Sequence, residues 1–241
     1  MSYLSRIDHA FSDAPVLPLS ENGRYGLFSD CHRGIGTSND NFLKNQHLYF
    51  AALNYYYQHS FCYIELGDGD ELWENRSFSA IQNIHSNVFW LLSLFYEEHR
   101  LFMLFGNHDI AKKDFHPFSD CCFHEGLRLK DCVTGQELYL THGHQADFFN
   151  STLWRLSCFL VRYLWKPLEQ FGVLDPTSAA KNYKVKNKTE QRLQEWTKLH
   201  KKILITGHTH RPVLGSKDSL YFNTGSCVHP RCITCIELVH R

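Results

Sequence analysis

Five short apolar runs, rich in aromatic and β-branched residues, are spaced along the whole chain at residues 24–29, 61–66, 101–105, 137–140 and 203–206. Runs of this length and composition are typical of strands that are buried on both faces of a sheet. The pattern therefore predicts five core strands.

Two longer segments between these runs have a different period. Residues 39–59 and 78–98 carry apolar side chains at helical spacing, and each lies between two predicted strands. We expect them to be the crossover helices of βαβ units, which makes the fold α/β. Residues 125–140 and 219–238 alternate between apolar and polar positions and turn at glycines, so we expect antiparallel strands at the sheet edges.

A short polar cluster follows each predicted core strand. The clusters are Asp30-Cys31-His32, Gly67-Asp68-Gly69-Asp70-Glu71, Gly106-Asn107-His108-Asp109, Thr141-His142-Gly143-His144 and Gly207-His208-Thr209-His210. One such cluster alone is more often a turn or a helix cap. Ligands of open α/β sheets bind in the crevice outside the carboxyl ends of the strands, so five clusters in order can converge on one site.

The residue types in these clusters indicate a metal centre. Asp30 and His32 are two residues apart, as are His208 and His210, and in an extended chain such side chains point the same way. Each pair can therefore face one site. Carboxylate, imidazole and amide donors suit manganese, iron or zinc, and the set contains no thiolate.

The ordered motifs D-x-H, G-D, G-N-H-D, H-G-H and G-H-T-H resemble those of the calcineurin-like metallophosphoesterase superfamily, from Asp30 to about residues 223–226. The resemblance implies one domain over residues 1–241, a four-layer sandwich of two mixed β-sheets flanked by helices. It implies that Asp30, His32 and His210 bind one metal ion, that Asn107, His142 and His208 bind a second, and that Asp68 bridges the two. His108 matches the position that contacts the scissile phosphate and assists the leaving group.

The chemistry of such a centre agrees with this resemblance. Two divalent ions about 3.5 to 4 Å apart can share one hydroxide, lower its pKa and neutralise the charge on the phosphorus oxygens during in-line displacement. We therefore expect an enzyme that hydrolyses a phosphodiester or a pyrophosphate with a hydroxide that bridges two metal ions. Mn²⁺ is the favoured metal, with iron or zinc as alternatives.

A neighbouring carboxylate is expected to orient the imidazole of His108. Asp109 lies next to it and could hold one imidazole tautomer. The second motif of the superfamily is usually G-D-x-x-D, but Glu71 stands at its last position here, so either Asp70 or Glu71 could orient His108.

Residues 148–202 are expected to form a helical cap inserted within the domain. An aromatic-rich helix over about 150–171, bent near Pro167, precedes a basic helix over about 189–200. Residues 151–202 contain eleven Lys or Arg and four Asp or Glu, although the net charge of the whole chain is zero. Three basic residues within the first helix argue against a transmembrane span.

Two interpretations of this cap remain open. Its apolar face could pack on the core or on a second copy of the protein. Alternatively, Trp154 and Trp165 could bind the organic part of a substrate, and the basic rim could attract an anionic head group or a membrane surface. The second layout resembles the UDP-2,3-diacylglucosamine pyrophosphatase branch of the superfamily, in which a helical insertion holds acyl chains, although that branch commonly has Arg in place of His108.

Two further residues are candidates for substrate contact. Arg33 could clamp a phosphate oxygen, or it could be a solvated loop arginine. His144 could approach the phosphate, or it could only close its loop. The expected partner is a phosphorylated small-molecule or lipid-linked substrate, and the alternative activities are a phosphomonoesterase and, with less support, a nuclease.

The amino-acid composition narrows the possible partners and the cellular compartment. A net charge of zero argues against a general polyanion binder, so no specific nucleic acid is expected. Nine cysteines accompany an N-terminal segment without an apolar core, so we expect reduced thiols and a cytoplasmic protein, either free or at the inner face of the membrane. Cys232 and Cys235 have the spacing of a zinc or redox pair, but they lie in the expected last strand, which favours a structural role.

Overall fold

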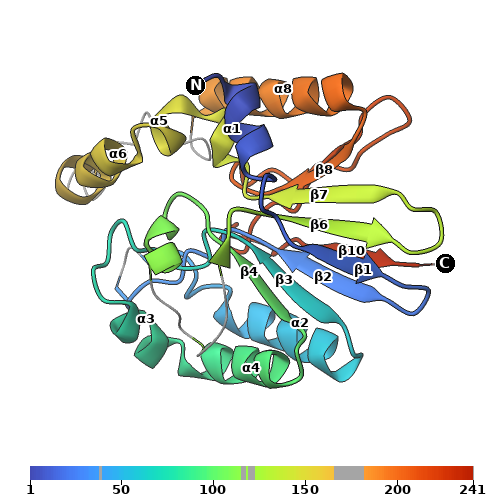
Figure 1. Cartoon of the computed structure of the whole chain (residues 1–241). Helices are drawn as coiled ribbons and strands as arrows, with labels where there is room; N and C mark the ends of the chain where they lie inside the picture. Colours follow the sequence, from blue (N-terminus) through green and yellow to red (C-terminus); the bar gives the residue numbers. More distant parts are fainter. Residues whose placement is uncertain (38–39, 115–117, 119–122, 166–181, 241) are drawn as a thin grey trace.

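Two mixed five-stranded β-sheets, stacked face to face, form the centre of the molecule (Figure 1). The computed structural model describes the chain except residues 38–39, 115–117, 119–122, 166–181 and 241. One sheet has the strand order β1-β6-β7-β8-β9 and the other β10-β2-β3-β4-β5. The strands are β1 Val16–Leu19, β2 Arg24–Phe28, β3 Cys62–Leu66, β4 Leu101–Leu104, β5 Phe123–His124, β6 Gly126–Asp131, β7 Glu137–Thr141, β8 Ile203–Thr206, β9 Tyr221–Asn223 and β10 Ile236–Val239.

Helices cover the outer face of each sheet, which completes the expected four layers (Figure 1). Helices α2 and α4 pack on the β2-β3-β4 sheet, and α1 and α8 pack on the β7-β8 sheet. The helices are α1 Tyr3–His9, α2 Gln46–Gln58, α3 Phe78–Ile84, α4 Ser86–Glu97, α5 Phe148–Ser151, α6 Trp154–Leu160 and α8 Tyr183–His200. The α/β sandwich expected from the sequence is therefore confirmed.

Alternating side chains of the core strands fill two different layers. Leu27 and Ile64 lie in the layer between the sheets, whereas Phe28 and Tyr63 face α2 and α4. All four are fully buried. Successive side chains of a strand point to opposite faces, and here both faces are covered. This burial on both sides explains why the predicted strands are almost continuously apolar.

The edge strands agree only in part with the sequence pattern. β10 is an edge strand and pairs antiparallel with β2, as expected. β6 pairs antiparallel with β7, also as expected, but both strands lie inside their sheet between β1 and β8, so the expectation that they form an edge was wrong. β9 instead pairs parallel with β8, so the expectation for this edge was wrong. The long connection of residues 207–220 lets the chain return in the same direction, because parallel neighbours need a crossover of about a dozen residues or more.

Three of the expected helices have different bounds. The helix expected over 39–59 begins at Gln46, and the helix expected over 78–98 divides at His85. His85 is fully buried, and its Nε2 lies 3.1 Å from a carboxylate oxygen of Asp40, which holds the break in place. The basic helix starts at Tyr183 because the Asn182 side chain accepts hydrogen bonds from the first-turn amides.

The aromatic-rich part of the insertion is not one helix. It consists of α5, α6 and a π-helical turn at Val161–Trp165, and the expected bend at Pro167 lies outside the described residues. Within the described parts of the chain, no helix is both long and apolar enough to cross a bilayer. The seven cysteines in those parts are free thiols. Cys232 and Cys235 both precede β10, so the expectation that they lie in the last strand was wrong.

A fully buried ion network lies below the carboxyl ends of β2, β3 and β4. Arg33 Nε is 2.7 Å from Asp70 Oδ1, and Arg33 Nη1 is 2.9 Å from Glu65 Oε2. Lys112 Nζ is 2.6 Å from Asp70 Oδ2 and 2.7 Å from Asp109 Oδ2. All five side chains have an exposed fraction of zero. Burial raises the pKa of Asp70, but the two cations outweigh it and lower the pKa to about 2.

We predict that Lys112→Met lowers the free energy of unfolding by about 3 to 5 kcal/mol, because it leaves buried carboxylates without their cation. Lys113→Met is the matched control, since Lys113 is the next residue and is exposed. It should change stability by no more than about 0.5 kcal/mol. Urea denaturation measures both, and equal losses for the two variants would contradict the role given to Lys112.

Candidate metal centre

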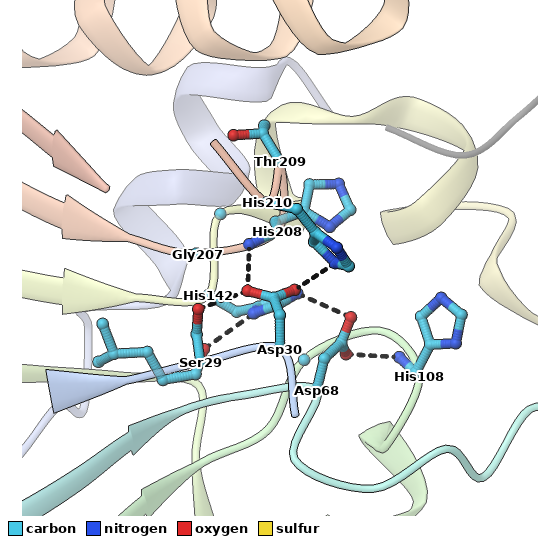
Figure 2. A network of polar contacts seen from close by, with 12 residues as sticks. Ser29, Asp30, Asp68, His108, His142, Gly207, His208, Thr209 and His210 are labelled. Carbon is cyan, nitrogen blue, oxygen red and sulfur yellow. Dashed lines mark hydrogen bonds and ion pairs between the residues drawn. The ribbon is translucent and has the colours of Figure 1, made fainter. Parts of the chain in front are cut away.

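Two adjoining groups of side chains form the candidate site at the carboxyl ends of the strands (Figure 2). One group is Asp30, His32 and His210, and the other is Asp68, His142 and His208; the possible ligand atoms within each group lie within 4.8 Å of one another. They follow β2, β3, β7 and β8, so both sheets contribute. All the residues that the superfamily resemblance assigns as metal ligands, Asn107 apart, therefore fall into these two groups.

The two groups are in direct contact. His142 Nε2 is 3.0 Å from Asp68 Oδ2 and 4.0 Å from Asp30 Oδ1, while His210 Nε2 is 3.1 Å from Asp30 Oδ1. His32 Nε2 lies 3.9 Å from Asp68 Oδ2. Figure 2 shows the imidazoles of His142 and His210 pointing toward the two carboxylates. The Asp68 carboxylate thus lies between the groups, as a bridging ligand must.

Asn107 Oδ1 and His208 Nε2 are buried in the site and lack a hydrogen-bond partner among the residues that the structure describes. Asp30 Oδ1 and His142 Nε2 make only the imidazole–carboxylate contacts given above. Buried polar atoms are normally hydrogen-bonded, so each exception needs an explanation. A carboxylate, an amide oxygen and imidazole nitrogens that converge in this way fit divalent ions such as manganese, iron or zinc. This donor set identifies Asn107 as a further possible ligand.

The backbone is strained at the candidate ligands. Asp30, His32, Asp68, His208 and His210 all have positive φ angles, between 46° and 69°. For residues other than glycine the left-handed region costs about 1 to 2 kcal/mol each, and such strain is concentrated at functional sites. The expectation that the chain is extended at Asp30 and His32, and at His208 and His210, was therefore wrong. His208 and His210 consequently point into different groups, whereas Asp30 and His32 share one.

Two motif glycines allow close approach to the carboxylates. A Cβ at Gly106 would overlap the Asp68 carboxylate, and a Cβ at Gly207 would overlap that of Asp30. The backbone amide of His208 donates to Asp30 Oδ2 at 2.9 Å, and that of His108 donates to Asp68 Oδ1 at 2.8 Å. The loop after β8 is therefore fastened to Asp30 of the other sheet, and the loop after β4 to Asp68 at the end of the neighbouring strand β3.

Glu71 is the carboxylate that contacts His108. Its Oε1 is 2.8 Å from His108 Nδ1, and its Oε2 is 2.9 Å from His32 Nδ1. Between the two candidates left open by the sequence, the structure therefore brings Glu71 and not Asp70 to this imidazole. Burial lowers the pKa of His108, but Glu71 and Asp68 outweigh it, so the pKa lies above its ordinary value. The Trp73 ring stacks on the imidazole with centroids 4.2 Å apart.

Three other candidates lie in the ion network instead. Asp70 and Arg33 are bonded to each other inside the protein, so Arg33 does not face the site as a phosphate clamp. Asp109 accepts hydrogen bonds from the amides of Gly106 at 2.7 Å and Gly69 at 3.0 Å, and from Lys112. Asp109 therefore holds the loops that carry the ligands rather than the imidazole of His108.

His144 lies beside the second group of ligands. Its ring centroid is 5.6 Å from that of His142 and 6.5 Å from that of His208. It is buried, and its Nδ1 has no hydrogen-bond partner among the described residues. Burial, reinforced by His142 and His208, holds the pKa of His144 well below its ordinary value, so the imidazole is neutral.

Trp154 and His144 line the same cavity. Trp165 is not one of the described residues that line this cavity.

Contacts with the site loops hold the insertion in place. Arg162 donates to the carbonyl oxygens of Trp73 at 2.7 Å and Leu72 at 3.0 Å. On α8, buried Glu190 accepts from Thr209 at 2.9 Å, within the G-H-T-H motif.

Sequence reasoning did not single out Lys112, Arg162 or Glu190. Lys112 follows the G-N-H-D motif by three residues and has no apolar periodicity around it that would mark it as buried. Arg162 and Glu190 were part of a basic, amphipathic segment, in which charged residues are usually solvated. Only their contacts with distant loops distinguish them.

Comparisons with known proteins add little to this picture. No family model matches the chain, and no curated protein matches it. One solved structure that it resembles is a conserved uncharacterized protein of Streptococcus pneumoniae TIGR4, described as a predicted phosphoesterase, at a TM-score of 0.40 and 16% identity over 90% of this chain and 83% of that chain. We draw no functional conclusion from so distant a likeness, and nothing in it supports the diacylglucosamine pyrophosphatase branch.

Protons should compete with cations for this site. Burial lowers the pKa of His142, but Asp68 and Asp30 outweigh it and raise the pKa to about 9, so without an ion the imidazole is protonated below that pH. A metal ligand must be neutral, so binding releases this proton. We predict that the apparent affinity for Mn²⁺ rises about tenfold per pH unit between about pH 6 and about pH 8 for each proton released.

Isothermal titration in buffers of different ionisation enthalpy measures both the affinity and the number of protons released. Asp218→Asn is the control, because Asp218 is an exposed aspartate outside the site and its removal should change neither quantity. An affinity that does not vary with pH would contradict the assignment of His142 as a ligand.

Proposed function

We propose that the protein is a metal-dependent phosphoesterase that hydrolyses a phosphodiester or pyrophosphate, nucleotide- or lipid-linked, with two divalent ions, of which Mn²⁺ is favoured. The observation that carries the proposal is the pair of adjoining ligand groups with Asp68 between them, beside the buried Asn107 Oδ1 and His208 Nε2, which lack a hydrogen-bond partner among the described residues. When bound, two divalent ions would polarise the phosphoryl oxygens and lower the pKa of a water nucleophile.

His108 is the proposed proton donor to the leaving group. Its Nδ1 is held by Glu71, which leaves Nε2 as the nitrogen that can carry a proton toward a substrate. Glu71 and Asp68 raise the pKa of the imidazole, which favours the protonated form that a general acid needs. The side chain is 21% exposed, which is enough for contact with a bound ligand.

Trp73 and Arg162 support this donor. The indole of Trp73 covers one face of the imidazole and excludes water from it. Arg162 holds the carbonyl oxygen of the same tryptophan, so the insertion fixes the stacked pair. The arrangement pre-organises one proton-donating geometry, and catalysis depends on such positioning.

The proposal predicts that the protein hydrolyses bis(p-nitrophenyl) phosphate when Mn²⁺ is present, and that chelation abolishes the activity. Asp68→Asn should reduce the rate to background, because it removes the charge that lies next to His142 of one ligand group and His32 of the other. Asp218→Asn, on the exposed surface, should retain the full rate. A faster rate on p-nitrophenyl phosphate than on the diester would favour a phosphomonoesterase, and no rate on either would refute the proposal.

We also predict that the effect of His108→Asn depends on the leaving group. With methyl aryl phosphates, loss of a general acid should cost about 10²- to 10⁴-fold in kcat for phenol, and much less for p-nitrophenol, which leaves without a proton. Glu71→Gln should also lower kcat more for phenol than for p-nitrophenol, but by a smaller factor, because the imidazole remains. The metal content of each variant serves as the control, and an equal loss for all leaving groups would exclude the role of proton donor.

A further inference from the structure

A cavity of about 330 Å³ opens beside the candidate metal centre, on the side of His144. Its walls come from segments far apart in the sequence: the N-terminal helix α1, the end of β4, the turn after the G-N-H-D motif, the H-G-H loop and the start of α6. Its lining includes Arg6, His9, Phe105, Lys113, His144 and Trp154. We call this space the Arg6 cavity.

We propose that the Arg6 cavity binds the part of the substrate that stays on the phosphorus, and that this part carries a second anionic group together with a ring or other flat apolar moiety. The inference rests on the proposed function and narrows its substrate class to phosphodiesters with such a retained group. A simple phosphomonoester would leave the cavity empty.

The position of His144 connects the cavity with the metal centre. Its ring lies beside His142 and His208, and it also forms part of the cavity wall. His108, the proposed donor to the leaving group, lies beside the other ligand group, with its ring centroid 4.7 Å from that of His32. The leaving group and the cavity are therefore on different sides of the ligands, so the cavity suits a retained group. The buried His144 Nδ1, which lacks a partner among the described residues, offers it a hydrogen bond.

The charge of the cavity favours an anion. Arg6 and Lys113 are permanent cations in its wall, and His9 is a third basic group. Glu125 is the opposing carboxylate, and it accepts a hydrogen bond from Gln145 at 3.0 Å. Hydrogen bonds from guanidinium and ammonium groups to phosphate or carboxylate are among the strongest in proteins.

The placement of Arg6 is fixed in advance. Its Nε donates to the carbonyl oxygen of Gln145 at 2.8 Å, and its Nη1 donates to that of Met1 at 3.0 Å. These bonds use two of the five N–H donors of a guanidinium, so others remain for a ligand. Burial lowers the pKa of Arg6, and the nearby Arg192 lowers it further, so an added anion would relieve local repulsion.

Part of the cavity lining is apolar and aromatic. Phe105, Ile110 and Trp154 line it. An aromatic face next to cations is suited to a ring that carries a phosphate or carboxylate, because stacking and ion pairing then act on the same ligand. The cavity is also large enough for a group of this size, since pockets for small ligands start at about 300 Å³.

Two substrates that differ by one phosphate test the inference. They are thymidine 5′-(p-nitrophenyl phosphate) and the same compound with a 3′-phosphate, which share the leaving group and the ring. The wild-type protein should show a KM about tenfold or more lower for the second compound, as expected for one charge-assisted contact. Lys113→Met and Arg6→Met should each remove most of this difference through KM, with kcat retained.

The controls separate a binding role from a structural one. Lys217→Met, at an exposed lysine outside the cavity, should keep the preference. Arg6 also ties down α1, so Arg6→Met could destabilise the fold; Lys113 is exposed and avoids this problem. Equal KM values for the two substrates in the wild type, or a preference that survives in Lys113→Met, would overturn the inference. Hydrolysis of bis(p-nitrophenyl) phosphate tests the proposed function separately.

Discussion

The structure depends on keeping two carboxylates, Asp30 and Asp68, buried side by side past the carboxyl ends of β2 and β3, which are neighbouring strands of one sheet. Moving a charge out of water costs several kcal/mol unless it gains partners. Asp30 obtains them from the amide of His208 and the imidazole of His210, and Asp68 from the amide of His108 and the imidazole of His142. The partners come from other strand ends, so the same contacts that satisfy the carboxylates also align the two sheets.

The buried ion network next to the site stabilises this arrangement. The buried network of Arg33, Lys112 and three carboxylates leaves few ways for the loops to relax, and Asp109 accepts hydrogen bonds from the amides of Asp68 and of Gly106, which precedes Asn107. This rigidity explains how five non-glycine residues can remain in the left-handed region. The surrounding contacts must supply the free energy that the strained backbone costs.

The insertion is part of the site and not an appendage to it. Glu190 on α8 holds Thr209 between two candidate ligands, and Arg162 holds the backbone of Trp73 beside the proposed proton donor. Its aromatic Trp154 contributes to the wall of the Arg6 cavity. A substrate that fills the cavity would therefore contact the same segment that positions the catalytic groups, which links recognition of the retained group to alignment of the leaving group.

The sequence by itself determined the core strands and the candidate ligands. Both are local signals: burial on two faces requires continuous apolar runs, and a ligand must carry a donor atom just past a strand end. Tertiary structure alone decided that Glu71 rather than Asp70 contacts His108, and that Arg33 is an internal counter-ion. It also decided that α1, far away in the sequence, brings Arg6 to His144. These choices depend on which distant side chains meet, and neither residue type nor spacing along one segment records that.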